Sequence, residues 1–266
     1  MSLERALSKL GYCSRSQASS FIKAGRVSVD NRIISDPSFR CSPGNDNIAI
    51  DGEKIRDKKC VYFVMNKPVG FVTTRSDERG RKTVYDILDD AGEWIFPVGR
   101  LDKDTSGLLL FTNDNRFGER MTNPNSAIPK TYRARLNKPM LPEHERLFRH
   151  GMTLEGEKLL PATVRAMKSF PLSPGPGQKV ARGSVSVDAG LPGCWIELTI
   201  FEGKNRQVRR MCESVGYKVL ELTRIRIGDY ELGNLKPGEW KKLARHEVEL
   251  LTAGTSVYKS KVKSQN

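Results

Sequence analysis

The segment at residues 99–110 reads GRLDKDTSGLLL, a polar loop between glycines that runs directly into an apolar stretch. The apolar stretch predicts a buried strand over residues 108–111. A carboxylate at such a strand entrance is held rigidly and can face a cleft, as a nucleophile requires. The same pattern fits a turn in which Asp102 and Asp104 only accept hydrogen bonds from nearby backbone amides. Taken alone, the segment leaves both interpretations open.

Further strands and a helix are predicted on either side of this segment. Residues 61–65 form a short apolar run, and residues 194–200 alternate between apolar and polar side chains, as a half-buried strand does. Residues 205–215 carry apolar side chains at helical spacing, and Gly216 follows as a helix-ending glycine. We therefore expect a sheet with flanking helices.

The N-terminal residues predict a separate small unit. Apolar spacing indicates a helix over residues 3–10 that ends at Gly11. Ser14 is the expected N-cap of a second helix, which Gly25 ends. The alternating residues 27–34, with a turn at their centre, then predict a small β unit.

These patterns divide the chain into three parts of an α+β protein. We expect a small N-terminal domain over residues 1–57, a larger domain over residues 58–252 and a polar, lysine-bearing disordered tail over residues 253–266. The stretch at residues 171–183 is rich in proline and glycine and is expected to be a long surface loop.

The charge of the chain indicates a polyanionic partner. The formal net charge is +14 at pH 7, which suits a nucleic acid or an acidic membrane surface. No run of ~18 apolar residues is present, and the first ten residues do not resemble a signal peptide, so nucleic acid is the better partner. Five scattered cysteines without a Cys-x-x-Cys pair suit a reducing cytoplasm.

Two basic segments supply candidate contacts to RNA. Residues 203–226 hold seven basic and two acidic residues, and Arg206 and Arg210 are spaced one helical turn apart. Residues 130–135 read KTYRAR, which places Tyr132 among cations, as a stacked base and its phosphate require. The alternatives are a solvated helix face and an ordinary strand with an inward tyrosine.

Three sequence motifs, in this order, closely resemble the ribosomal-RNA pseudouridine synthases of the small-subunit and large-subunit branch. They are Asn-Lys-Pro-x-Gly at residues 66–70, Gly-Arg-Leu-Asp-x-x-Thr-x-Gly-Leu at residues 99–108 and Gly-x-Asn-Arg-Gln-Val-Arg-Arg-Met at residues 203–211. The N-terminal region resembles the small αL RNA-binding domain shared with a small-subunit ribosomal protein. The resemblance spans residues 3–250 and implies a catalytic domain built on a mixed, mostly antiparallel sheet.

The resemblance also implies roles for individual residues. Asp102 matches the nucleophile, Tyr132 the residue that stacks on the target uracil, and Arg209 the basic residue that pairs with the catalytic carboxylate. Arg100 matches the arginine that enters the RNA helix where the base has left. The other substrate contacts that we expect are Lys130, Lys204, Arg206 and Arg210 in the catalytic domain, and Arg15, Lys23 and Arg26 in the N-terminal domain. Ser16 and Arg206 depart from the residues usual in relatives, which bears on the choice of RNA site.

The implied reaction fits what the sequence lacks. Pseudouridine formation breaks the C–N glycosidic bond and rejoins the ribose to C5 of the same base, without redox change or group transfer. The sequence has no glycine-rich dinucleotide motif, and its three histidines lack metal-ligand spacing, so neither cofactor nor metal is expected. Asp102 could attack uracil C6 or ribose C1′, and flipping the base out of its stack costs a few kcal/mol.

Several alternatives remain at this stage. Residues 205–210 favour large-subunit over small-subunit ribosomal RNA as the substrate. A non-catalytic ribosome-assembly factor would explain the charge but would give Asp102 no role. A retaining glycosidase would need Asp102 and Asp104 about 5 Å apart on one sugar, and the surrounding cations suit RNA better. We expect a monomer that binds neither DNA nor membranes.

Overall fold

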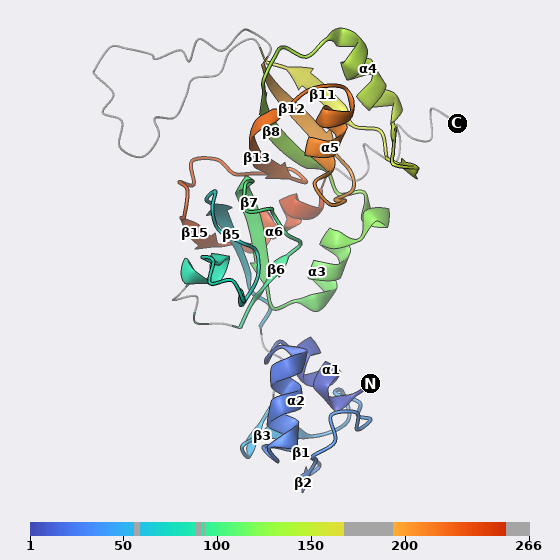
Figure 1. Cartoon of the computed structure of the whole chain (residues 1–266). Helices are drawn as coiled ribbons and strands as arrows, with labels where there is room; N and C mark the ends of the chain where they lie inside the picture. Colours follow the sequence, from blue (N-terminus) through green and yellow to red (C-terminus); the bar gives the residue numbers. More distant parts are fainter. Residues whose placement is uncertain (56–58, 89–91, 93, 168–193, 254–266) are drawn as a thin grey trace, which may run out of the picture.

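The computed structural model describes residues 1–55, 59–88, 92, 94–167 and 194–253. The chain forms a small N-terminal part and a larger part above it, as Figure 1 shows. The domain boundary at residue 57, the loop at residues 171–183 and the tail after residue 253 lie outside the described residues.

The N-terminal part packs two helices on a four-stranded antiparallel sheet of order β2-β1-β3-β4. Ser14 is the N-cap of the second helix, where its hydroxyl accepts the Gln17 N–H at 3.2 Å, and Gln17 Oε1 accepts the Ser14 N–H at 3.0 Å. Gly11 and Gly25 end the two helices in the left-handed region, as predicted. The elements are α1 (Leu3–Lys9), α2 (Arg15–Lys23), β1 (Val27–Val29), β2 (Arg32–Ile33), β3 (Ile48–Ile50) and β4 (Glu53–Lys54).

The larger part is built on a nine-stranded sheet. Its main path is β11-β12-β8-β13-β7-β5-β15, with β14 paired to β13 and β6 paired to β7. Among the strand pairs of the described residues, only β13–β7 is parallel, so the predicted mixed, mostly antiparallel sheet is confirmed. The strands are β5 (Tyr62–Lys67), β6 (Phe96–Val98), β7 (Ser106–Thr112), β8 (Lys130–Leu136), β11 (Thr163–Ala166), β12 (Trp195–Ile200), β13 (Val219–Ile227), β14 (Tyr230–Glu231) and β15 (Trp240–Lys242). A separate hairpin joins β9 (Thr153–Leu154) to β10 (Glu157–Lys158).

Both faces of the central strands are buried. In β7, Leu109 and Phe111 belong to one apolar cluster, whereas Leu108 and Leu110 belong to another. This explains why residues 108–111 are a continuous apolar run rather than an alternating one. The helices are α3 (Asn115–Thr122), α4 (Pro142–His150), α5 (Gln207–Ser214) and α6 (Arg245–Thr252), with 3-10 turns at Val84–Asp86 and Pro124–Ser126. Within the described ranges, no helix is long and apolar enough to cross a membrane.

Two of the boundaries that differ from the sequence prediction concern the candidate site. The helix predicted over residues 205–215 begins at Gln207, because Arg206 adopts a left-handed backbone with φ 45°. The strand predicted to end at residue 65 continues to Lys67, which pairs with Gly107 of β7. Asn66 and Lys67 therefore belong to a strand and not to the turn that follows it.

Gly107 allows the closest backbone approach in the catalytic part. A Cβ atom at this position would lie 2.3 Å from the Arg224 carbonyl oxygen and 2.8 Å from the Arg224 nitrogen, and φ is +102°. Only glycine fits such a position without displacing the neighbouring strand. Gly107, the second glycine of the 99–108 motif, thus permits the parallel pairing of β7 with β13.

Candidate active site

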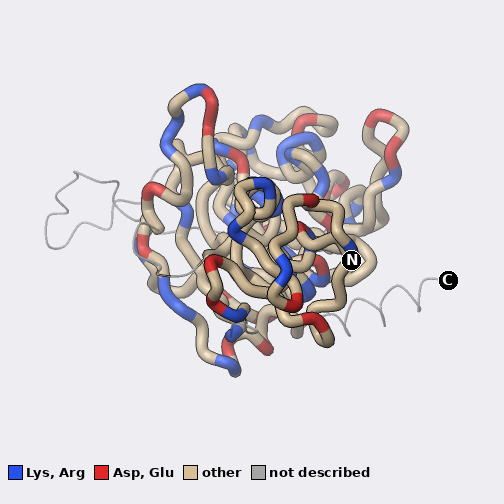
Figure 2. Tube along the Cα trace, turned by 90° about the horizontal axis from the view of Figure 1, so that it is seen from below, with Lys and Arg blue, Asp and Glu red and all other residues tan. Residues whose placement is uncertain are grey.

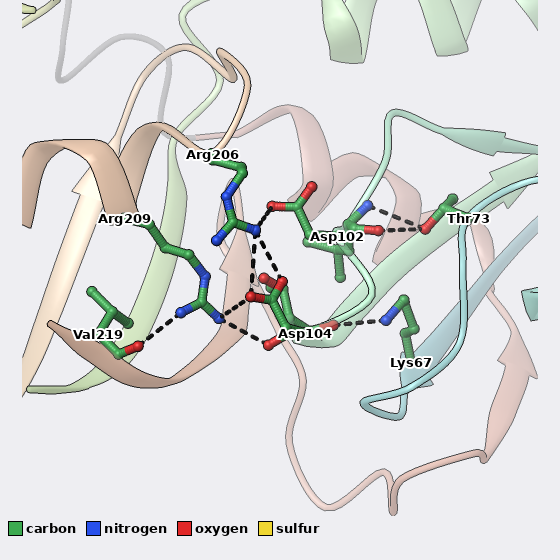
Figure 3. A network of polar contacts seen from close by, with 9 residues as sticks. Lys67, Thr73, Asp102, Asp104, Arg206, Arg209 and Val219 are labelled. Carbon is green, nitrogen blue, oxygen red and sulfur yellow. Dashed lines mark hydrogen bonds and ion pairs between the residues drawn. The ribbon is translucent and has the colours of Figure 1, made fainter. Parts of the chain in front are cut away.

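The backbone around Asp102 is fixed on both sides. The Leu101 N–H donates to Thr73 Oγ1 at 3.2 Å, and the Thr73 hydroxyl donates to the Leu101 carbonyl at 2.8 Å, both in a buried setting. After the carboxylate, the Thr105 N–H donates to the Asp102 carbonyl at 3.1 Å. These bonds, drawn in part in Figure 3, hold Asp102 at the entrance to β7 while 38% of its side chain stays exposed.

Lys67 holds the same loop through hydrogen bonds to backbone carbonyls. Its side chain is fully buried, and Nζ donates to the Thr105 carbonyl at 2.7 Å and to the Pro68 carbonyl at 3.0 Å. Burial lowers the pKa of Lys67 to about 8, although the charges of Asp104 and Asp102 oppose that shift. The motif at residues 66–70 thus contacts the loop that carries the candidate nucleophile.

The ion pairs of the loop differ from the predicted ones. Arg206 Nη1 lies 3.6 Å from Asp102 Oδ2 and 3.2 Å from Asp104 Oδ1. Arg209 Nη2 lies 3.2 Å from Asp104 Oδ2 and donates to the Asp104 carbonyl at 2.9 Å, as Figure 3 shows. The expectation that Arg209 pairs with Asp102 is therefore wrong for this structure, in which Arg206 makes that contact.

The position at which α5 begins explains why Arg206, and not Arg209, contacts Asp102. Arg209 is on the buried face of the helix, where Nη1 donates to the Val219 carbonyl at 2.8 Å and only 7% of the side chain is exposed. Arg206 precedes the helix, and its left-handed backbone leaves 42% of its side chain exposed beside the two carboxylates. The two arginines therefore reach the loop at different points.

One cavity brings most of the predicted site residues together. It has a volume of about 470 Å³ and lies between the Asp102 loop, the sheet and the start of α5. Tyr132, which is only 8% exposed, points inward from β8 and lines this cavity, and its contact with RNA stays a prediction. The predicted site residues that line the cavity are Arg100, Asp102, Lys130, Tyr132, Lys204 and Arg206.

The remaining catalytic-domain candidate lies apart from these residues. Arg210 does not line the cavity and pairs instead with Glu155 at 3.0 Å. The predicted joint presentation of Arg206 and Arg210 fails because Arg206 is not part of the helix. Arg210 as an RNA contact stays a prediction.

The three N-terminal candidates lie on or beside α2. Arg15 and Lys23 are exposed at the two ends of the helix. Arg26 donates from Nε to Asp51 Oδ1 at 2.9 Å and lies over the Phe21 ring at 4.6 Å. This pairing raises the pKa of Arg26 and lowers that of Asp51. Figure 2 shows basic and acidic positions interspersed over this end of the molecule.

One charged residue that lines the cavity was absent from the predicted site. Arg224 lines the cavity from β13, is 4% exposed, and donates from Nε to the Leu108 carbonyl at 2.7 Å. Its only signal in the sequence is an arginine that alternates with apolar residues in a strand-forming run at residues 222–227. Among the described residues, no group of three or more His, Cys, Asp or Glu side chains could hold a metal ion.

Comparison with known proteins identifies the family to which this fold belongs. The RNA pseudouridylate synthase family model matches residues 61–214, and the S4 domain model matches residues 1–48. The chain therefore belongs to the RNA pseudouridylate synthase family and carries an N-terminal S4 domain. It is an isomerase that converts uridine to pseudouridine in RNA, which sets the glycosidase alternative aside.

Individual relatives match nearly the whole chain. Ribosomal large subunit pseudouridine synthase B of Bacillus subtilis is 35% identical over 251 residues, which cover 94% of this chain and 95% of that protein. An uncharacterized RNA pseudouridine synthase of Aquifex aeolicus is 31% identical and covers 94% of this chain and 92% of its own length. A crystal structure of a pseudouridylate synthase has 30% identity and a TM-score of 0.63, with 94% of this chain and 99% of that chain covered.

Proposed function

We propose that this protein isomerises specific uridines of ribosomal RNA, in the large subunit, with Asp102 as the nucleophile. The observation that carries the assignment of Asp102 is its place in the cavity, where its carboxylate shares one space with the Tyr132 ring and several cations. The relative from Bacillus subtilis, named for the large ribosomal subunit, supports the choice of RNA.

The cavity residues have distinct proposed roles. Tyr132 stacks on the flipped uracil, because its ring is buried yet borders the cavity. Arg100 is exposed at the mouth and enters the RNA helix in place of the departed base. Lys204 and Arg206 contact phosphates, with Arg210 as an outlying contact, and these interactions offset the few kcal/mol that flipping costs.

Arg209 is proposed as a positioning residue. Its guanidinium joins the Asp104 carboxylate, the Asp104 carbonyl and the Val219 carbonyl, and so ties the Asp102 loop to α5 and β13. It would thus keep the nucleophile in place through the loop rather than by direct contact with Asp102. Attack of Asp102 on uracil C6 or on ribose C1′ is compatible with this geometry.

The N-terminal S4 domain is proposed to add RNA-binding surface through Arg15, Lys23 and Arg26, all of which are exposed. The basic charge of the whole chain favours RNA over any uncharged partner. We propose that the protein acts as a monomer in the cytoplasm and does not use DNA.

The test is incubation of the purified protein with unmodified small-subunit and large-subunit ribosomal RNA, followed by carbodiimide mapping of pseudouridine. We expect one or a few new sites in the large-subunit RNA. Asp102→Asn should remove all of them while RNA binding changes by less than about threefold, because the carboxylate acts in the reaction and not in docking.

Other outcomes would revise the proposal in different ways. Product from Asp102→Asn would exclude Asp102 as the nucleophile. New sites only in the small-subunit RNA would correct the substrate. Tight binding without any site, in naked RNA and in partly assembled subunits alike, would favour the assembly-factor alternative.

A further inference from the structure

Two cations line the cavity from the sheet, which we call the floor of the cavity. Lys130 and Tyr132 are two residues apart on β8 and so face the same side of the sheet. Arg224 pairs with Tyr132 across the β8–β13 ladder, which puts it on that side as well. All three residues line the cavity. We refer to Lys130 and Arg224 as the floor cations.

Arg224 is buried and Lys130 is half-buried, and neither has a compensating carboxylate in the described part of the chain. Arg224 Nε donates to the Leu108 carbonyl, but its buried Nη2 atom has no hydrogen-bond partner. Lys130 Nζ donates to the Ile128 carbonyl at 3.2 Å, and neither cation forms an ion pair with a described carboxylate. Burial, together with the charge of Arg224, lowers the pKa of Lys130 to about 8. Two desolvated cations side by side are costly unless a negative group joins them.

We propose that the floor cations stabilise the negative charge that develops on the target uracil during the reaction. This rests on the proposed function of Asp102 and Tyr132, because the base must lie against the tyrosine to reach the floor. Lys130 was expected to contact RNA; the inference is that its partner is the reacting base and not a phosphate.

The electrons of the reaction place charge on the base by either route. If Asp102 attacks C6, its electron pair forms the C–O bond and the C5–C6 π electrons move onto C5 and the O4 carbonyl. If Asp102 attacks C1′, the C1′–N1 bond breaks and its electrons move onto N1 and the O2 carbonyl. In both cases the charge of the carboxylate passes to the uracil ring, where fixed donors in a buried site are most effective.

A backbone phosphate is a poorer occupant of this floor. The phosphates of an RNA strand lie in its backbone and remain outside the cavity when a base enters it. Arg100 and Arg206 border the opening, are exposed and can reach these phosphates. Only 4% of the surface of Arg224 is exposed to solvent. A flat base that enters past Tyr132 is therefore the more suitable ligand for the floor.

The test compares Lys130→Met with Lys204→Met, a lysine of the same cavity that is paired with Glu157 at 3.0 Å. Single-turnover rates, RNA affinity and its salt dependence are measured on the large-subunit fragment that holds the modified uridine. Lys130→Met should lower the rate at saturating protein by about 100-fold and change the dissociation constant by less than threefold. Lys204→Met should mainly weaken affinity and reduce the salt slope by about one.

Lys130→Arg and Arg224→Lys guard against a purely structural effect. Lys130→Arg keeps a cation and should recover at least a tenth of the wild-type rate, whereas Arg224→Lys should lose about 10-fold in rate with unchanged affinity. Methionine in place of a desolvated lysine should leave the fold intact, which thermal unfolding checks.

Each remaining result overturns the inference. An active wild type with an unchanged Lys130→Met rate overturns it while the proposed function stands. A weaker affinity and smaller salt slope in Lys130→Met, with an unchanged rate, would identify a phosphate contact instead. A wild type that modifies neither ribosomal RNA would overturn both proposals.

Discussion

The cations at the opening of the cavity and those on its floor are chemically alike but differ in their surroundings. At the opening, Arg206 is 42% exposed and lies beside Asp102 and Asp104, and Lys204 lies beside Glu157. On the floor, Arg224 and Lys130 have no carboxylate partner among the described residues, and Arg224 is almost fully buried. An exposed ion pair contributes only ~0–1 kcal/mol, so a phosphate can replace its carboxylate at little cost.

This difference separates docking from chemistry. The cations of the opening can exchange one anion for another, which suits the binding and release of an RNA backbone. The floor cations cannot be solvated in the same way, and a buried unsatisfied donor costs ~1–3 kcal/mol. Such a cost is tolerated at functional sites. There, negative charge that develops on the substrate during the reaction accepts the hydrogen bond and offsets the cost.

The largest expected effect comes from breaking the scaffold of the floor at Gly107. In Gly107→Ala the new Cβ would lie 2.3 Å from the Arg224 carbonyl oxygen, and the alanine would have to keep a backbone φ of +102°. Strain and overpacking together should lower the free energy of unfolding by ~2–4 kcal/mol and abolish most of the activity. Urea unfolding and single-turnover assays measure the two effects.

Gly203→Ala is the matched control for that variant. Gly203 borders the same cavity, but a Cβ there would meet nothing within 4 Å. Its free energy of unfolding should stay within ~0.5 kcal/mol of the wild type, as for other surface changes. Equal stability of the two alanine variants would contradict the close approach of β7 and β13.

The next prediction separates the opening of the cavity from the outer face of α5. Arg206→Ala should weaken RNA binding by about 3- to 10-fold and reduce the salt slope by about one, because one phosphate contact is lost. Arg210→Ala should weaken it by less than about threefold, since Arg210 lies outside the cavity and is paired with Glu155. Measuring both in the Asp102→Asn background isolates binding from turnover. An equal loss in the two variants would extend the docking surface beyond the opening.

The sequence predicted those features that depend on neighbouring residues. Helix ends at Gly11, Gly25 and Gly216, the N-cap at Ser14 and the alternation of residues 195–200 all follow from local backbone and periodicity rules, and all are present. The motif at residues 99–108 likewise marked the entrance of β7 correctly.

The features that the sequence could not predict depend on contacts between distant segments. Arg206 and Arg209 are three residues apart in the sequence. The left-handed backbone at Arg206 places its side chain, and not that of Arg209, beside Asp102. Similarly, Lys67 supports a loop 38 residues away, and Arg224 bonds to a carbonyl 116 residues away. Charged residues inside apolar strands were the available signal, because a lysine or arginine is seldom buried without a specific reason.

The smallest expected effect applies the same contrast, paired against unpaired cations, to the N-terminal domain. Arg15 and Lys23 are exposed at opposite ends of α2, whereas Arg26 is held by Asp51 and the Phe21 ring. Arg26 donates to Asp51 through both Nε and Nη2, whereas Arg206 reaches its carboxylates through Nη1 alone. A phosphate therefore displaces the Asp51 carboxylate less readily, and its net gain at Arg26 is small. The double variant Arg15→Ala with Lys23→Ala should weaken RNA binding by about threefold at low salt, and Arg26→Ala by less than twofold. Filter binding at two salt concentrations distinguishes them, because the double variant should also lose salt dependence. A larger loss from Arg26→Ala would mean that RNA displaces Asp51 from Arg26, and that pairing within the protein does not predict which cations are left for RNA.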